Sequence, residues 1–219
     1  MTLPFRTDAE IDAAIPRVRE HLAGGGLLAY PTETVYGLGS GPSVPALEAL
    51  ARLKGRSPDK PFLLLVSSRA MVEAWGLVLT TAARALAAAF WPGPLTLVLP
   101  GGEGKLPDQL RGREGGIAVR YTSHAGIARL VAATGGPLTS TSANRPGNPP
   151  APGADRIREV FAPEVERGEL LVLDGGTLPS TPPSSTSSSP RATSGAKTSR
   201  MRSAPGAGGS PGRLAEVEV

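Results

Sequence analysis

Apolar residues near the start of the chain recur at the spacing of one helix face, which predicts an amphipathic helix. The positions that share this period are Ile11, Ile15, Val18 and Leu22. Thr7 and Glu10 have the spacing of a capping box at the start of this helix, and the glycines at 24–26 predict its end. Similar apolar stripes predict further helices over 44–53, 71–77, 82–90 and 124–133.

Short apolar runs bounded by glycine, proline and polar residues predict strands. These runs cover 27–30, 62–66, 94–99, 117–120, 138–140 and 170–173. Short strands that alternate with helical stretches are typical of an α/β layered fold. In such folds, functional residues collect in the loops at strand ends.

Composition excludes several classes of protein. The chain has 219 residues, enough for one domain with a full core, and its net charge is +4. It has no cysteine and only two histidines, so disulfides, thiolate catalysis and a metal site built from these residues are not expected. No apolar run reaches the roughly 20 residues that span a bilayer, and we expect a cytoplasmic protein without a membrane partner.

The composition changes towards the C-terminus. From about residue 179 the sequence is rich in serine, proline, threonine and glycine, with few large apolar residues. Such a segment cannot bury enough apolar surface to offset the entropy of ordering it. We therefore predict a folded domain over 1–178 and a disordered low-complexity tail over 179–219.

A basic cluster follows the helix predicted over 44–53. Lys54, Arg56 and Lys60 lie in a loop just before a strand. Lysine supplies a point charge and arginine a bidentate fork, which suits a polyanion such as a triphosphate. The alternative is a solvated helix end, where basic residues complement the helix dipole.

Other polar residues also follow predicted strands. The run 139–144 contains four hydroxyls and an amide, which could hold a polar substrate but would equally suit a turn or a helix N-cap. Arg120 ends another strand, where it could pair with a carboxylate ligand, whereas we expect His124 only to start a helix. The loop over 31–39 lacks the glycine spacing of a phosphate-binding loop, and no Gly-x-Ser-x-Gly is present. Substrate assembly and charge stabilisation are therefore expected rather than covalent catalysis.

Taken in order, several segments between about residues 11 and 176 carry a specific combination of motifs. They are AYPTETVYGLG at 29–39, KGRSPDKPFLLLV at 54–66, FWPGPLTLVL at 90–99, IAVRYTSH at 117–124, PLTSTSANRPGNPP at 137–150 and LVLDGG at 171–176. With these motifs the chain resembles the YrdC family, the threonylcarbamoyl-AMP synthases of tRNA modification.

This resemblance implies a twisted, mixed α/β sheet with flanking helices and a basic concave cavity. It also implies a reaction: L-threonine, bicarbonate and ATP give threonylcarbamoyl-AMP, pyrophosphate and water. A downstream tRNA threonylcarbamoyl-transferase complex would then modify the adenosine at position 37 of tRNA. Mg²⁺ would be carried by the ATP rather than by a dedicated protein site.

The resemblance also assigns roles residue by residue. Lys54 and Arg56 correspond to the catalytic cations that bind the triphosphate of ATP, and Lys60 to a third. The other correspondences are Ser142 and Asn144 for ATP, and Thr32, Arg120 and Ser140 for threonine.

The resemblance weakens after the Asp-Gly-Gly turn at 174–176, where the family continues with a short Val-Val-Asp strand. Here Ser184-Ser185-Thr186 follows, which is what the codons GUC GUC GAC give when read one base later. One hypothesis is therefore that the tail is translated out of frame. If the tail is instead genuine, one wall of the site is missing, and an inactive homologue is an alternative to the synthase. Two further functions compete with the synthase: a non-catalytic module with weak RNA binding, and a carbamoyl-adenylate enzyme of the hydrogenase-maturation type.

Overall fold

The structure, a computed structural model, describes residues 1–57, 60–178 and 217–218. Its helices are α1 (Asp8–Ala23), α2 (Val44–Lys54), α3 (Arg69–Ala74), α4 (Thr81–Phe90), α5 (Ala125–Thr134), α6 (Ala154–Val160) and α7 (Ala162–Glu166), with a 3-10 turn at Asp108–Leu110. Its strands are β1 (Thr2–Pro4), β2 (Leu27–Pro31), β3 (Tyr36–Gly39), β4 (Leu63–Val66), β5 (Thr96–Leu99), β6 (Ile117–Tyr121), β7 (Leu138–Ser142), β8 (Leu170–Asp174) and β9 (Val217–Glu218).

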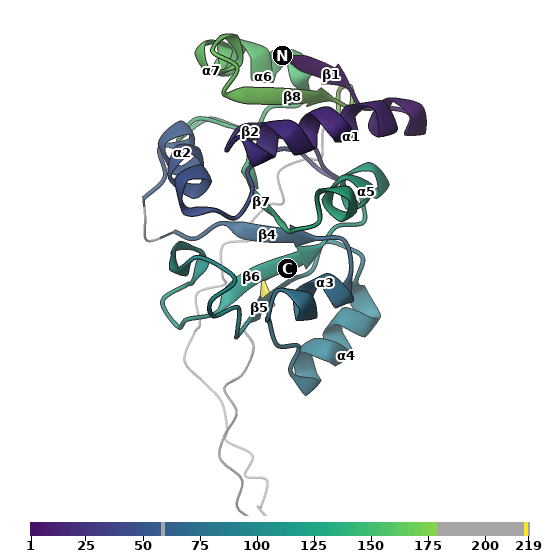
Figure 1. Ribbon diagram of the computed structural model, residues 1–219, viewed down its shortest axis with the longest axis vertical. Helices are drawn as coiled ribbons and strands as arrows, with labels where there is room; N and C mark the ends of the chain where they lie inside the picture. Colours follow the sequence, from purple (N-terminus) through teal and green to yellow (C-terminus); the bar gives the residue numbers. More distant parts are fainter. Residues whose placement is uncertain (58–59, 179–216, 219) are drawn as a thin grey trace, which may run out of the picture. The chain divides into compact units, whose positions relative to one another are not determined.

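The strands form one mixed sheet in the order β1-β8-β2-β3-β7-β4-β6-β5-β9. The pairs β1/β8, β2/β8 and β4/β6 are parallel, and the remaining pairs are antiparallel. Most of this order can be followed from strand to strand in Figure 1. The α/β fold predicted from the apolar pattern and the mixed sheet implied by the family resemblance are both confirmed.

Each face of the sheet packs against its own set of helices. Because side chains alternate along a strand, Leu28 and Leu27 enter different apolar clusters. One cluster joins the sheet to α1 and α5, which lie side by side in Figure 1. The other cluster joins the opposite face to helices that include α2, α4 and α6. The sheet is therefore covered by helices on both faces.

The capping box predicted for the first helix is present. The Glu10 amide donates to Thr7 Oγ1 at 3.3 Å, and the Thr7 amide donates to Glu10 Oε2 at 2.9 Å. Pro16 lies inside α1 without ending it. His124 is the N-cap of α5, as expected, since its Nδ1 accepts the Ile127 amide at 3.3 Å.

Two segments that we predicted as loops are strands. Residues 36–39 form β3, and β7 extends beyond residue 140 to Ser142. The two glycines of β3 explain this, because a Cβ on Gly39 would lie 2.1 Å from the Thr139 carbonyl oxygen and one on Gly37 would lie 3.1 Å from the Tyr30 ring. The strand therefore needs residues without side chains to approach its neighbours.

The structure describes only two residues of the predicted tail. Val217–Glu218 pairs antiparallel with β5, while residues 179–216 and 219, including the hypothesised out-of-frame Ser184-Ser185-Thr186, lie outside the described residues. Within the described ranges, no helix is both long and apolar enough to cross a membrane.

Candidate functional site

Lys54 joins the end of α2 to the end of β7. Its ammonium donates to the Ser142 carbonyl oxygen at 2.6 Å, to Ser142 Oγ at 3.2 Å and to the Asn144 carbonyl oxygen at 3.0 Å, and it also contacts Asn144 Oδ1. Ser142 Oγ in turn donates to Asn144 Oδ1 at 2.7 Å. Three of the predicted ATP-binding residues, separated by up to 90 positions in sequence, are therefore in direct contact.

Gly55 lies between the two cations and ends the helix that carries Lys54. Gly55 adopts φ 60°, a left-handed conformation that ends α2 immediately after Lys54. A Cβ on Gly55 would also lie 3.0 Å from the Pro146 ring. Glycine is therefore needed here both for the turn and for the close approach of the segment after β7.

Arg56 is fixed by three oxygens and one aromatic ring. Its guanidinium donates to the carbonyl oxygens of Lys60 at 2.7 Å and Pro61 at 2.8 Å, and to Thr141 Oγ1 at 3.2 Å. It also lies over the Phe62 ring, 5.0 Å from the centroid. Lys60 contributes its carbonyl to this arrangement, whereas its side chain is exposed.

The surroundings of Lys54 and Arg56 lower the pKa of both side chains. Lys54 is only 9% exposed. Its burial, and then repulsion by the Arg56 guanidinium, lower the pKa of Lys54 to about 8. Burial also lowers the pKa of Arg56. An anion bound nearby would relieve this repulsion.

Arg120 lies on β6 opposite Thr96 of β5. Its Nε and Nη2 donate to Thr96 Oγ1 at 3.0 and 2.8 Å. Side chains alternate between the two faces of a sheet, and Val119 lies on the face that packs against α2, so Arg120 lies on the opposite face. Leu138 belongs to the apolar cluster of that opposite face, and Ser140, two residues further along β7, lies on the same face. Burial lowers the pKa of Arg120, and the nearby Glu33 carboxylate opposes this shift.

The loop between β2 and β3 carries Thr32 and Glu33. Thr32 Oγ1 donates to the Val35 carbonyl oxygen at 2.6 Å, which closes the loop. Glu33 reaches across to the turn between β6 and α5, where its Oε1 accepts hydrogen bonds from Thr122, Ser123 and His124.

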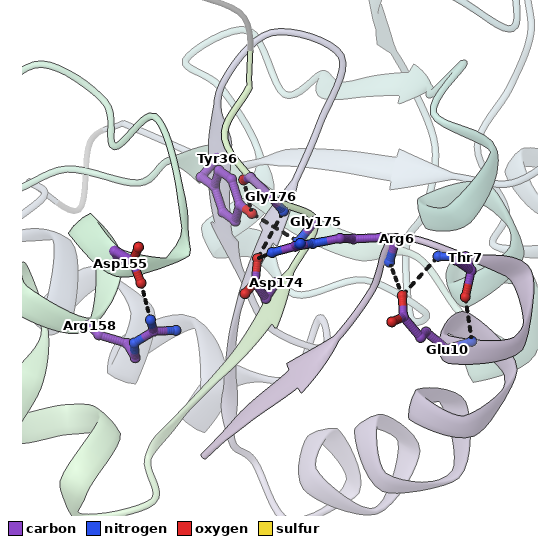
Figure 2. A network of polar contacts seen from close by, with 9 residues as sticks. All are labelled: Arg6, Thr7, Glu10, Tyr36, Asp155, Arg158, Asp174, Gly175 and Gly176. Carbon is purple, nitrogen blue, oxygen red and sulfur yellow. Dashed lines mark hydrogen bonds and ion pairs between the residues drawn. The ribbon is translucent and has the colours of Figure 1, made fainter.

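Tyr36 ties the same segment to the Asp-Gly-Gly turn. Its hydroxyl accepts the Gly175 amide at 2.9 Å and donates to the Gly176 carbonyl oxygen at 2.8 Å. Asp174 accepts the Gly176 amide at 2.8 Å and an Arg6 Nη2 hydrogen at 3.0 Å. Figure 2 shows Arg6 and Tyr36 converging on this turn, which is therefore anchored from both β3 and the N-terminal segment.

Lys54, Arg56 and Arg120 are all partly or fully withdrawn from solvent, yet no carboxylate of the described ranges forms an ion pair with them. Buried charges are normally paired. Such a set of cations is suited to anionic ligands. The same ranges contain no group of three His, Cys, Asp or Glu side chains arranged to hold a metal ion.

The predicted site residues thus fall into two groups. Lys54, Ser142 and Asn144 are joined directly, and Arg56 reaches the same strand through Thr141. For the predicted threonine residues the structure describes no direct hydrogen bond among Thr32, Arg120 and Ser140.

Sequence reasoning missed several residues around these groups. Glu33 and Tyr36 lie within the quoted motif at 29–39, so that motif was their only signal. Thr96 lies within the quoted motif at 90–99, but its contact with Arg120 depends on the pairing of β5 with β6.

Comparison with known proteins gives one family. The model of the Sua5/YciO/YrdC family, which carries the description "Telomere recombination", matches residues 20–189. A threonylcarbamoyl-AMP synthase of Nitrosococcus oceani is 42% identical over 159 residues, which cover 70% of this chain and 85% of the relative. A threonylcarbamoyl-AMP synthase of Chromohalobacter salexigens is also 42% identical, with coverage of 72% and 82%.

Solved structures of Sua5 and YciO, two proteins named in the matched family model, are also similar to this chain. P. abyssi Sua5 complexed with L-threonine matches with a TM-score of 0.70 and 32% identity, over 81% of this chain and 51% of that chain. This chain therefore spans about half the length of Sua5. E. coli YciO matches with the same TM-score of 0.70 at 24% identity, over 82% of this chain and 85% of that chain, which supports the fold alone.

Proposed function

The chain belongs to the Sua5/YciO/YrdC family, and on that premise we propose that it is a threonylcarbamoyl-AMP synthase. The substrates are L-threonine, bicarbonate and ATP, and the products are threonylcarbamoyl-AMP, pyrophosphate and water. Relatives of this name are enzymes that transfer a group, and the group transferred here would be the adenylyl moiety of ATP. Within that class, the chain would be a nucleotidyltransferase.

The observation that carries the proposal is the set of unpaired cations. Lys54, Arg56 and Arg120 are partly or fully withdrawn from solvent, and none of them forms an ion pair with a carboxylate among the described residues, although Glu33 lies near Arg120. ATP brings a triphosphate and threonine brings a carboxylate, so both substrates supply the negative charge that this set is suited to. The bound L-threonine of the similar Sua5 structure supports the same assignment.

The chemistry needs no protein nucleophile. The threonine amine attacks bicarbonate to form a carbamate and release water. A carbamate oxygen then attacks the α-phosphorus of ATP, so one new phosphorus–oxygen bond forms as the bond to pyrophosphate breaks. The protein's task is to align these groups and to stabilise the charge that develops on the leaving pyrophosphate.

We assign this task to the Lys54 group. Lys54 and Arg56 would bind the triphosphate and act as the catalytic cations, with the exposed Lys60 ammonium as a third positive charge. Ser142 and Asn144 would bind ATP, and their contacts with Lys54 hold both at the end of β7.

Threonine would be held from the other group. Arg120 would pair with the threonine carboxylate, with Thr32 and Ser140 as hydrogen-bonding partners. Arg120 is suited to this role because Thr96 Oγ1 accepts from two of its nitrogens, which fixes the guanidinium while Nη1 has no hydrogen-bond partner in the part of the chain that the structure describes.

The remaining partners follow from this activity. Mg²⁺ would arrive on the ATP phosphates, where it would neutralise charge. The product would pass to a tRNA threonylcarbamoyl-transferase complex. The relatives are named as synthases, which does not favour an inactive homologue. Salt-sensitive binding of RNA by a protein that does not turn over ATP would instead support the RNA-binding module.

Pyrophosphate release from ATP, measured with and without L-threonine and bicarbonate, tests the proposal. We expect release to require threonine and to fall by about a hundredfold or more in Lys54→Ala and in Arg56→Ala. Lys105→Ala and Arg84→Ala are matched controls, since Lys105 donates to the Ala74 carbonyl oxygen and Arg84 pairs with Glu73 at the surface. Threonine-independent release, or equal losses in the controls, would contradict the proposal.

A further inference from the structure

We infer that Glu33 is a positioning residue for threonine, because its carboxylate holds the loop that carries Thr32 against the turn that follows Arg120. The inference rests on the proposed function, since it concerns two of the three segments assigned to threonine. Glu33 itself is not assigned a substrate contact.

A single carboxylate oxygen of Glu33 connects the loop after β2 to the turn between β6 and α5. Glu33 Oε1 accepts Thr122 Oγ1 at 2.6 Å, the Ser123 amide at 2.7 Å, Ser123 Oγ at 3.0 Å and the His124 amide at 3.0 Å. We call these four hydrogen bonds the Glu33 link. They join residues about 90 positions apart, so the link is formed by the fold and not by local sequence.

A negative charge suits this place for two reasons. The accepted amides belong to the residues that lead into α5, where the dipole of the helix favours an anion. Partial burial alone raises the pKa of Glu33, but the hydrogen bonds from Thr122, Ser123 and His124 outweigh it and lower the pKa to about 2. The link is therefore charge-assisted at neutral pH.

The link lies directly beside two of the three proposed threonine contacts, Thr32 and Arg120. Glu33 follows Thr32 in sequence, and Thr122 is two residues beyond Arg120. Apart from the Glu33 link, the structure describes no hydrogen bond between the loop at 31–35 and the turn at 120–124. If the link is removed, the loop that carries Thr32 loses its hydrogen bonds to the turn that follows Arg120.

The ATP-binding group does not depend on the link. Lys54 is held by Ser142 and Asn144, and Arg56 is held by Lys60, Pro61 and Thr141. None of these contacts involves Glu33 or the β6–α5 turn. Loss of the link should therefore weaken the use of threonine much more than the use of ATP.

Glu33→Gln and Glu33→Ala test the inference. We expect the KM for threonine to rise about tenfold or more in Glu33→Ala, with a smaller rise in Glu33→Gln because the amide oxygen can still accept. The KM for ATP should change by less than about twofold. In nuclear magnetic resonance spectra, the amide protons of Ser123 and His124 should shift in both variants.

Glu10→Gln is the matched control. Glu10 also accepts backbone amides at a helix start, from Arg6 at 2.8 Å and Thr7 at 2.9 Å, but it lies in the α1 capping box (Figure 2). We expect it to lower the melting temperature without changing either KM. This separates a general loss of stability from loss of the link.

The outcomes distinguish the two levels of the account. An unaltered enzyme that releases no pyrophosphate in response to threonine would contradict the proposed function itself. An active enzyme whose Glu33 variants keep the KM for threonine, or change both KM values equally, would overturn the role of Glu33 alone.

Discussion

Lys54 is a residue whose charge changes close to neutral pH. Burial and the Arg56 guanidinium lower its pKa to about 8, so the ammonium is charged below that pH and neutral above it. If the charge binds the triphosphate, kcat/KM for ATP should fall as the pH rises through about 8. This dependence belongs to the free enzyme, since bound phosphates would raise the pKa again.

A pH profile of kcat/KM for ATP checks this expectation. Removing the neighbouring charge in Arg56→Met should move the midpoint of the profile to higher pH, in addition to lowering activity, because repulsion no longer favours the neutral amine. A profile that stays flat between about pH 7 and about pH 9 would show that the charge on Lys54 is not needed for ATP use.

Strand β3 depends on its glycines. A Cβ on Gly39 would lie 2.1 Å from the backbone oxygen of Thr139, which cannot move without disturbing β7. Gly39→Ala should therefore lower the free energy of unfolding by about 1–3 kcal/mol. Gly41→Ala is the control, since nothing lies within 4 Å of its Cβ position, and urea unfolding of both variants measures the difference. Equal stability of the two variants would contradict this account of β3.

The helices and strands with clear apolar periodicity were predicted correctly, and the reason is local. α1, α2, α4 and α5 each place apolar residues on one face. β3 was missed because Tyr-Gly-Leu-Gly has the composition of a turn, and its strand state depends on neighbours in β2 and β7. β1, α6 and α7 were missed because their apolar residues are too few to give a pattern.

For the molecule as a whole, the site depends on contacts between distant segments. No local rule brings Lys54 to Asn144 or Glu33 to Ser123, which are separated by about 90 residues in each case. The motif resemblance predicted one ATP-binding group of five residues: Lys54, Arg56, Lys60, Ser142 and Asn144. The structure places Lys54, Ser142 and Asn144 in direct contact, whereas the Lys60 side chain is exposed. Thr96 and the Glu33 link required the sheet register and the position of α5. The roles of all these residues in catalysis stay predictions.

The central claim is that one chain joins threonine, bicarbonate and ATP. The most direct test is mass spectrometry of the product formed by the purified protein from L-threonine, isotopically labelled bicarbonate and ATP. The account predicts threonylcarbamoyl-AMP that carries the label in its carbamoyl carbon and forms together with pyrophosphate. An adenylate without the label, or no threonine-containing adenylate from folded protein, would contradict it.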